Sequence, residues 1–435
     1  MAKPQSLLPA SDDFPLEPVP KSRELHWFAL TTMRFGQFAT LAQLLMGASL
    51  GYGMGLIPAF LALAAGTAIL LAVAIPMGIV GQETGLATTF LTRWTGLGRW
   101  GSGLFSLVIG VSVMGWFGVQ NALFAQGIHQ LAGSGPLWIW TLVSGLAVTA
   151  LVYGGILSMG WVAYFTVPLF LVLLAVGFGH ILSHPVAGIA LWHAPGIHAI
   201  PFQAAITVVV GSFITGAAVS PDMTRFHRNR KDVVAQTIAT FVLGNALIAG
   251  LGVFGAQLLR SSNLTTAIAL GGVWGWFLFV SSTIKVSDWD IYGAALALVN
   301  GIDLLGIRRI SRRNMTLVVG VGGTLLAMAG IVNAFLPFLL FIGVATPPVA
   351  AIILVDYFMG RRSRALLVSR ETLSSSARPG RLNAGALLAW GGGFAAGQWL
   401  PVGIGAINSL VAALVIYGFS IYVTRPGGQM AGAEE

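Results

Sequence analysis

The residues best suited to bind a ligand lie inside long hydrophobic stretches of this chain. Trp116 and Gln120 are four positions apart, so a helix would present both on one face. A tryptophan ring stacks on flat molecules, and an amide hydrogen-bonds to the edge of a heterocycle. The pair therefore predicts a site for a planar heterocycle. The alternative is helix packing by Trp116, with Gln120 bonded to a neighbouring backbone.

A second candidate reads Gly211-Ser212-Phe213-Ile214-Thr215-Gly216 within an apolar run. Glycine is needed where backbone opens or approaches another group closely. We expect a broken transmembrane helix here that carries half of the binding site, with Gly211, Ser212, Phe213 and Thr215 as substrate contacts. The alternative is a small-residue face for helix packing.

Polar side chains also interrupt the first hydrophobic segment, at Gln37, Thr40 and Gln43. Such groups are costly in lipid, so they should face a water-filled cavity or bond to a neighbouring helix. Gln37 and Thr40 are predicted substrate contacts. Arg34, near the end of the same segment, is expected to extend towards water.

Lys285 is the one lysine inside a hydrophobic segment, close to Ser282, Asp288 and Asp290. A charged lysine at the bilayer centre costs at least ~3 kcal/mol, so it should be paired or lose its proton. Intramembrane charges commonly mark transport paths. We therefore assign Lys285, Asp288 and Ser282 to a site for a coupling ion or a surrogate cation. A Lys–Asp pair that only fixes packing is the alternative.

Composition identifies the class of protein that holds these residues. Hydrophobic residues make up 56% of the 435, charged residues 9%, and the mean hydropathy is +0.84. A soluble protein carries about 25% charged residues. Apolar runs of about 20 residues indicate an all-α integral membrane protein rather than a barrel. The absence of cysteine excludes disulfides and thiolate metal sites.

The hydrophobic pattern predicts twelve transmembrane helices, with Pro347 and Pro348 breaking the tenth. The basic clusters at 225–231, 308–313 and 361–381 then share one side with both termini, and the opposite side receives Arg260 alone. The positive-inside rule makes that side cytoplasmic, in the inner membrane of a cell, so the charge implies no nucleic-acid partner. The predicted spans are 28–52, 56–80, 101–131, 136–156, 160–183, 202–221, 233–259, 267–300, 315–332, 334–358, 383–399 and 402–423.

Two blocks of five helices each open with a segment interrupted by glycine and polar residues, at 28–183 and 202–358. Paired interruptions of this kind are typical of inverted-repeat transporters with a site at the membrane midplane. The remaining parts are tails at 1–27 and 424–435, a basic cytoplasmic loop at 359–382 and two peripheral helices at 383–423. A monomer suffices, because the repeat encloses the site within one chain.

Other function classes find no support in the sequence. It has no HExxH, paired catalytic carboxylates or Walker motif, so neither an enzyme nor an ATP-driven pump is expected. The sequence also lacks a ring of pore-lining charges, which would indicate a channel. No cofactor and no metal site are expected.

Several motifs run in the order known from one transporter family. They are Gly115-Trp116-Phe117-Gly118-Val119, Val210-Gly211-Ser212-Phe213-Ile214 with Asp222 and Arg225-Phe226, Arg228-Asn229, Leu243-Gly244-Asn245, Pro347-Pro348-Val349 with Asp356-Tyr357 and Met359, and Ala396-Gly397 with Trp399-Leu400-Pro401. Over residues 28–423 the chain resembles the purine–cytosine permease family of nucleobase–cation symporters, and within it the bacterial cytosine permeases.

The resemblance implies a leucine-transporter-type fold, a five-plus-five inverted repeat with two additional helices, that imports a nucleobase by alternating access. It implies that Trp116 and Phe213 sandwich the base and that Thr215 offers a hydroxyl. Gln120 matches the amide of relatives that take hydantoins, so hydantoin, allantoin and hydroxymethylpyrimidine remain alternatives to cytosine.

The chain also departs from sodium-coupled relatives at the positions of the coupling ion. Sodium-coupled relatives place two adjacent hydroxyl residues where this chain has Lys285 and Val286. Since valine offers no oxygen ligand and lysine brings its own charge, the sequence favours a proton over sodium as the coupling cation.

Overall fold

The structure is a computed structural model, which describes residues 18–153, 172, 195–197, 200–262, 273–306, 310–360, 367 and 383–424. Within these residues the regular elements are helices, and one isolated parallel bridge joins Leu25 to His227. The helices are η1 (Lys21–Arg23), α1 (Trp27–Phe38), α2 (Leu41–Met54), α3 (Leu56–Thr84), α4 (Thr88–Trp94), α5 (Gly98–Ala132), α6 (Leu137–Tyr153), α8 (Phe202–Ala218), α9 (Pro221–Thr224), α10 (Arg230–Leu243), the π-helix η3 (Gly244–Ala249), α11 (Gly250–Leu259), α13 (Val273–Leu305), α14 (Arg312–Met328), η4 (Ile331–Ala334), α15 (Phe335–Ala345), α16 (Pro347–Met359), α18 (Ala384–Trp399) and α19 (Gly405–Thr424).

Where the structure describes them, the predicted spans overlap these helices. Residues 154–156, 267–272 and, apart from Val172, the span 160–183 lie outside the described residues. Five helical stretches of the described residues are long and apolar enough to cross a membrane: Leu56–Thr84, Gly98–Ala132, Arg230–Leu259, Ile331–Met359 and Gly405–Val423. The count of twelve and the internal repeat stay predictions.

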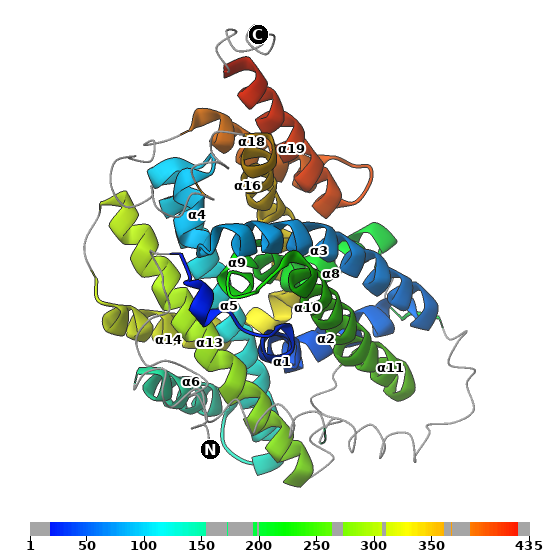
Figure 1. Cartoon of the computed structure of the whole chain (residues 1–435). Helices are drawn as coiled ribbons and strands as arrows, with labels where there is room; N and C mark the ends of the chain where they lie inside the picture. Colours follow the sequence, from blue (N-terminus) through cyan, green and yellow to red (C-terminus); the bar gives the residue numbers. More distant parts are fainter. Residues whose placement is uncertain are drawn as a thin grey trace, which may run out of the picture.

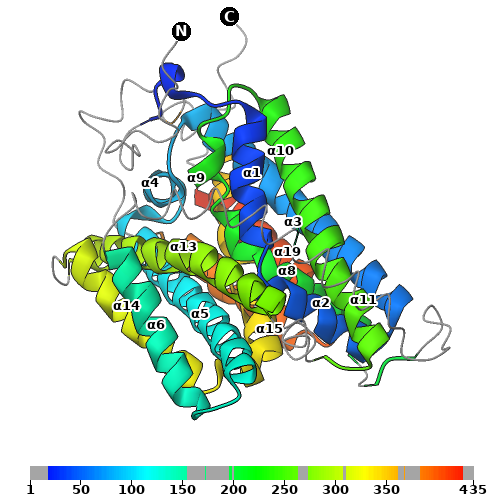
Figure 2. The same ribbon diagram turned by 90° about the horizontal axis from the view of Figure 1, so that it is seen from below.

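The helices form two groups (Figure 2). One group contains α1, α2, α3, α10 and α11, in which α2 packs on α11, and α10 packs on both α1 and α3. The other contains α5, α6, α13 and α14, with α13 and α14 both against α5. In Figure 1, α8 lies in the middle of the molecule, where it contacts α3 and α15.

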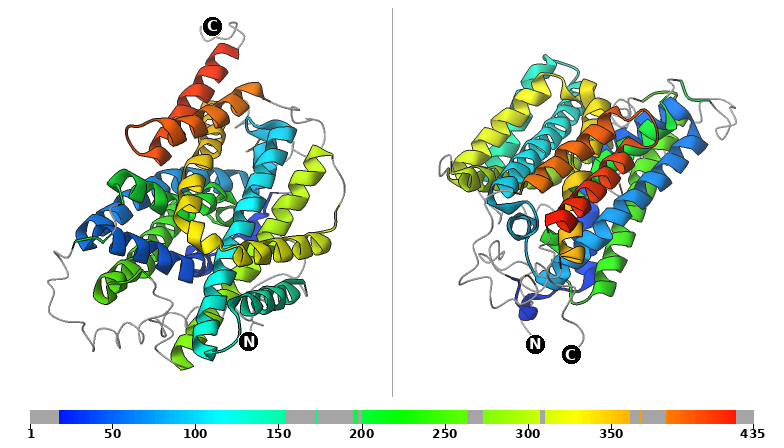
Figure 3. Two further views of the ribbon diagram at one scale, coloured as in Figure 1. Left: turned by 180° about the vertical axis from the view of Figure 1, so that it is seen from behind. Right: turned by 90° about the horizontal axis from the view of Figure 1, so that it is seen from above.

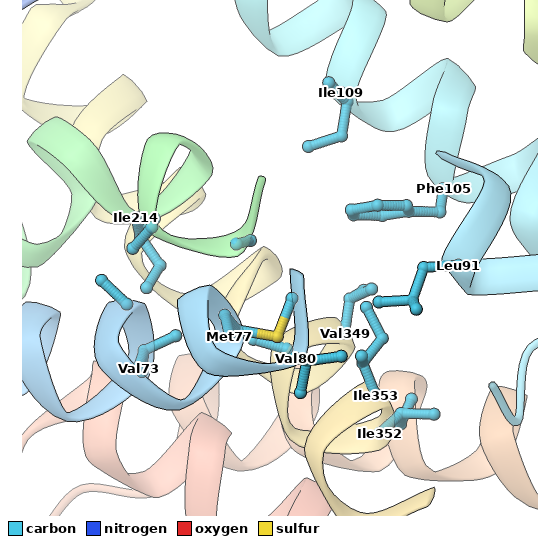
Figure 4. Packing of buried hydrophobic residues seen from close by; sticks show 14 of the residues in the cluster. Val73, Met77, Val80, Leu91, Phe105, Ile109, Ile214, Val349, Ile352 and Ile353 are labelled. Atoms are coloured by element: carbon cyan, nitrogen blue, oxygen red, sulfur yellow. The ribbon is translucent and has the colours of Figure 1, made fainter. Parts of the chain in front are cut away.

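Apolar side chains hold these groups together where α3, α5 and α16 meet (Figure 4). Met77 and Val80 of α3 lie beside Val349 of α16, whereas Val73 lies one turn away on α3, and Phe105 of α5 belongs to the same cluster. Because every one of these five side chains is at most 1% exposed, this contact is part of the molecule's core.

The helices α18 and α19 pair at the edge of the molecule (Figure 3). Their outer faces are apolar: Leu388 is 69% exposed and Phe419 is 67% exposed. An apolar face of this kind is expected where lipid covers it.

Of the three predicted helix breaks, the structure confirms two and contradicts one. The tenth span is interrupted at Thr346, between α15 and α16, which confirms the effect predicted for Pro347 and Pro348. The first span is interrupted between Phe38 and Leu41, as expected from its polar residues. The break expected within residues 211–216 is wrong, because α8 runs without interruption to Ala218.

Candidate substrate site

The break between α1 and α2 lies at Ala39 and Thr40. Ala39 leaves helical geometry (φ −74°, ψ 64°), and Thr40 is extended (φ −130°, ψ 152°). The Thr40 hydroxyl accepts a hydrogen bond from Gln43 N at 3.0 Å and so caps α2. The backbone therefore opens here in mid-segment. Thr40, a predicted substrate contact, uses its hydroxyl to hold that opening in place.

Gly211 lies within the uninterrupted helix α8 and packs closely against α15. A Cβ at Gly211 would overlap the backbone oxygen of Leu339 in α15, so only glycine allows this approach. The neighbouring Ser212 is 5% exposed, and its hydroxyl donates to Val209 O at 2.8 Å within α8. This part of the motif therefore packs α8 against α15, as the alternative interpretation expects, and the substrate contacts at Gly211 and Ser212 stay predictions.

Phe213 is half-buried and packs with two fully buried phenylalanines, Phe38 and Phe241, to form what is hereafter the Phe213 cluster. Its ring stacks on Phe38 with the centroids 3.9 Å apart and the planes 20° from parallel. Phe241 meets Phe213 edge-on, at 5.1 Å and 85°. The cluster joins the end of α1 to α8 and α10.

Trp116 has different aromatic neighbours. Its ring meets Phe338 at 5.6 Å and Phe335 at 6.1 Å, both edge-on and both from α15. The partners of Trp116 and Phe213 therefore differ, and the two rings do not stack on one another. Phe338 packs against both the core cluster that Phe213 borders and the core cluster that Trp116 borders. The sandwich implied for these two rings remains a prediction.

Two predicted substrate contacts, Gln120 and Thr215, have polar groups that bond to none of the described residues. Gln120 is 3% exposed, and its amide bonds to none of the described residues. Thr215 is 7% exposed, and its hydroxyl also has no partner there. Buried polar groups normally have partners, so an unused amide and an unused hydroxyl suit a polar ligand. Gln37 is half-buried at the end of α1.

Arg34 is buried rather than extended towards water, which corrects our expectation. It is 1% exposed, and its Nη2 donates to Gly216 O at 3.0 Å and to Ser220 Oγ at 2.7 Å. Its guanidinium also lies 5.1 Å from the centre of the Phe241 ring. Oxygens at the end of α8 attract a cation, so Arg34 fastens α1 to that helix.

Gln43 takes part in a buried chain of side chains that the sequence pattern alone did not reveal. Its Nε2 donates to Asn245 Oδ1 at 2.5 Å, and Asn245 Nδ2 donates to Thr67 Oγ1 at 2.9 Å. Asn245 lies in the π-helix η3, a kind of helical irregularity that is frequent at functional sites. The signal that could have revealed the chain is the Leu243-Gly244-Asn245 motif, whose asparagine needs a partner in lipid.

The predicted coupling residues Ser282, Lys285 and Asp288 all fall on α13, but their side chains lie outside the described residues. Ser287 beside them is fully buried, and its hydroxyl has no partner among the described residues. Within that part of the chain, no group of three or more His, Cys, Asp or Glu side chains could hold a metal ion.

Polar contacts also join helices at the end of α3. Glu83 at the end of α3 forms an ion pair with Arg230 of α10 and accepts a 2.6 Å bond from the Tyr357 hydroxyl of α16. Asp222 accepts a 2.6 Å bond from Thr88 N. Burial raises the pKa of Asp222, and the charge of nearby Arg225 opposes this effect.

Comparison with known proteins gives these observations a context. A family model described as "Permease for cytosine/purines, uracil, thiamine, allantoin" matches residues 18–421. The cytosine permease of Escherichia coli (strain K12) is 31% identical over 410 residues, which are 93% of this chain and 93% of the relative.

Solved structures show the same fold. The inward-facing conformation of Mhp1 superposes with a TM-score of 0.76 and 20% identity, covering 97% of this chain and 95% of that one. Mhp1, described as a nucleobase-cation-symport-1 family transporter, in a closed conformation with bromovinylhydantoin bound gives 0.72 and 19%, covering 96% of each chain. The apolar helices and these matches identify a multi-pass membrane protein with a transporter fold of the leucine-transporter type.

Proposed function

Because this chain belongs to the family of permeases for cytosine, purines, uracil, thiamine and allantoin, we propose that it imports a nucleobase by secondary active transport with alternating access. The observation that carries the proposal is the similarity to a cytosine permease over 93% of both chains. In this proposal Trp116 and Phe213 stack on the base. Gln120 and Thr215, which have unused hydrogen-bonding capacity, recognise its edge.

Another flat heterocycle is the second candidate: a hydantoin, allantoin or a hydroxymethylpyrimidine, whose transport could be coupled to sodium. The buried and unpartnered amide of Gln120 favours it, because ring carbonyls and ring N–H groups both bond to an amide. The solved relative that holds bromovinylhydantoin gives this candidate further support.

For the leading candidate we propose a proton as the coupling cation. The support is the pair Lys285 and Val286 at the positions of two hydroxyl residues in sodium-coupled relatives. A lysine in a low-dielectric segment can release its proton during the transport cycle.

The proposal places both termini in the cytoplasm and the protein in the inner membrane as a monomer. Its support is the distribution of Lys and Arg along the sequence. The five-helix repeats at 28–183 and 202–358, the basic loop at 359–382 and the peripheral pair at 383–423 are parts of the same proposal.

The test is uptake of radiolabelled cytosine into proteoliposomes with sodium and proton gradients imposed separately. Uptake driven by protons and indifferent to sodium is expected. Sodium-driven uptake would refute the role given to Lys285 and leave the substrate assignment in place. No cytosine uptake under either gradient, with uptake of hydantoin or allantoin, would favour the second candidate.

A further inference from the structure

One face of Phe213, a predicted stacking partner of the substrate, is covered by another ring of the protein, that of Phe38. Phe38 lies on Phe213 with the planes only 20° from parallel and the centroids 3.9 Å apart. Buried aromatic pairs are more often edge-to-face or offset at 4.5–7 Å. Phe38 thus lies on this face of Phe213 with the near-parallel geometry of a stacked heterocycle.

The neighbours of Phe38 hold its ring in this position. The side chain is fully buried, and a Cβ at Gly244 would overlap its ring carbon Cγ, so the glycine at the start of η3 makes the room. Phe241, equally buried, borders Phe38 at 5.3 Å and 66°. The contact with Phe213 therefore belongs to a packed site and is not an accidental approach of loose side chains.

The position of Phe38 beside the helix break allows its ring to move away from Phe213. It is the last residue of α1, and the next two residues, Ala39 and Thr40, are outside helical geometry. Rotation at these two residues can move Phe38 without unwinding α1 or α2. One turn earlier, Arg34 holds α1 to the end of α8 through Gly216 and Ser220, so the ring moves about a fixed point.

We propose that Phe38 is an internal competitor of the transported ring for the face of Phe213, an inference that rests on the proposed function. In the empty transporter Phe38 covers this face. When the substrate enters, it replaces Phe38, and the displaced ring carries the junction of α1 and α2 with it. Substrate binding is thereby coupled to a movement at the helix break. Only a ring flat enough to replace a phenyl group can cause that movement.

The experiment compares Phe38→Leu with Phe241→Leu in purified protein, using equilibrium binding of radiolabelled cytosine, uracil, allantoin and hydantoin. Both changes remove a fully buried phenyl ring from the same cluster, but only Phe38 covers the face of Phe213. Removing the competitor should tighten binding of the preferred heterocycle about 2- to 10-fold, the range expected for one aromatic pair. Phe241→Leu should leave the affinity unchanged or weaken it.

A double-mutant cycle tests whether the effect passes through Phe213. In a Phe213→Leu background, Phe38→Leu should no longer tighten binding. Equal or weaker binding by Phe38→Leu in the wild-type background, with a normal elution profile on size exclusion, would overturn the inference while the proposed function stands. If Phe38→Leu does not fold, Phe38→Met gives the same comparison with a side chain of closer volume. If the wild type binds none of the four compounds, the proposed function fails first.

Discussion

Arg34 illustrates how one charged side chain can be kept inside the membrane-embedded part of this protein. Among the described residues it has no carboxylate within ion-pair distance, and it depends on two oxygens and on the Phe241 ring. Removing an acceptor from a buried charge costs more than the bond itself contributes, because the charge stays desolvated. The strength of this contact therefore depends on Ser220 as well as on Arg34.

We predict that Ser220→Ala lowers the stability of the protein by about 1.5–3 kcal/mol, the usual value of a hydrogen bond to a charged group. Ser212→Ala is the matched control, since Ser212 is also buried in α8 but bonds only to Val209 O of its own helix. That change should stay within about 0.5 kcal/mol. Thermal unfolding in detergent measures both. Equal shifts for the two variants would argue against a fastening role for Arg34.

His227 gives a prediction about pH, since it lies in the turn after α9, outside the spanning helices. Burial lowers the pKa of His227 to about 4, against a smaller opposing effect of Gln236. The folded protein therefore holds this histidine neutral, whereas the unfolded chain binds a proton below about pH 6.5. Its contribution to stability is complete above about pH 6.5 and is lost as the pH falls towards 4. In unfolding experiments between pH 8 and pH 4.5, His227→Gln should lose less stability on acidification than the wild type. Parallel curves would contradict the assignment.

Among the elements, α2 is held against η3 and α11 by a seam of glycines. A Cβ at Gly47 would overlap the backbone oxygen of Ala249, and one at Gly252 would overlap that of Leu44. Gln257 strengthens the seam by donating to Gly51 O. Close backbone approach of this kind replaces the hydrophobic effect as the cause of association between helices in lipid.

We expect Gly47→Ala to destabilise the protein by at least 1–3 kcal/mol, the usual cost of overpacking, because backbone cannot move aside as a side chain can. Gly418→Ala is the control, since a Cβ there meets nothing within 4 Å and α19 lies at the edge of the molecule. It should be neutral or stabilising by up to about 1 kcal/mol. Half-lives of the folded protein at a fixed temperature would distinguish the two. Similar losses in both would show that helix propensity, and not the seam, decides the outcome.

The elements also show what the sequence can predict about this fold. Hydrophobic length located the long helices of the described residues, and Pro347 with Pro348 located the interruption at Thr346, because both signals are local. Residues 211–216 misled us: glycine permits both an open backbone and a tight helix contact, and only the position of α15 decides between them. The burial of Arg34 was mispredicted and the bonds of Asn245 were not predicted, since their partners are 182 or more and 178 or more residues away in the chain.

At the scale of the whole molecule, the open question is what drives accumulation. We predict that Lys285→Ala abolishes proton-driven accumulation in proteoliposomes while substrate still equilibrates across the membrane. The physical reason is that alanine cannot carry a proton or replace a cation. Lys231→Ala is the control, since Lys231 is exposed at the start of α10. Uphill uptake at the wild-type level by Lys285→Ala would show that the lysine has a structural role only.

The π-helix η3 has a consequence for how this chain can vary in length. Between α10 and α11 the hydrogen bonds of Gly244–Ala249 widen the helix, which accommodates one residue more than a regular α-helix would. Each residue turns an α-helix by about 100°, so one extra residue in a regular helix would rotate everything beyond it by that angle. The wide turn of η3 absorbs the extra residue instead, so that Gly252 and Gln257 of α11 face α2. Deleting one residue from Gly244–Ala249 should therefore restore regular helical bonding and keep the glycine seam, whereas deleting one residue from the regular part of α10 would rotate the seam away from α2.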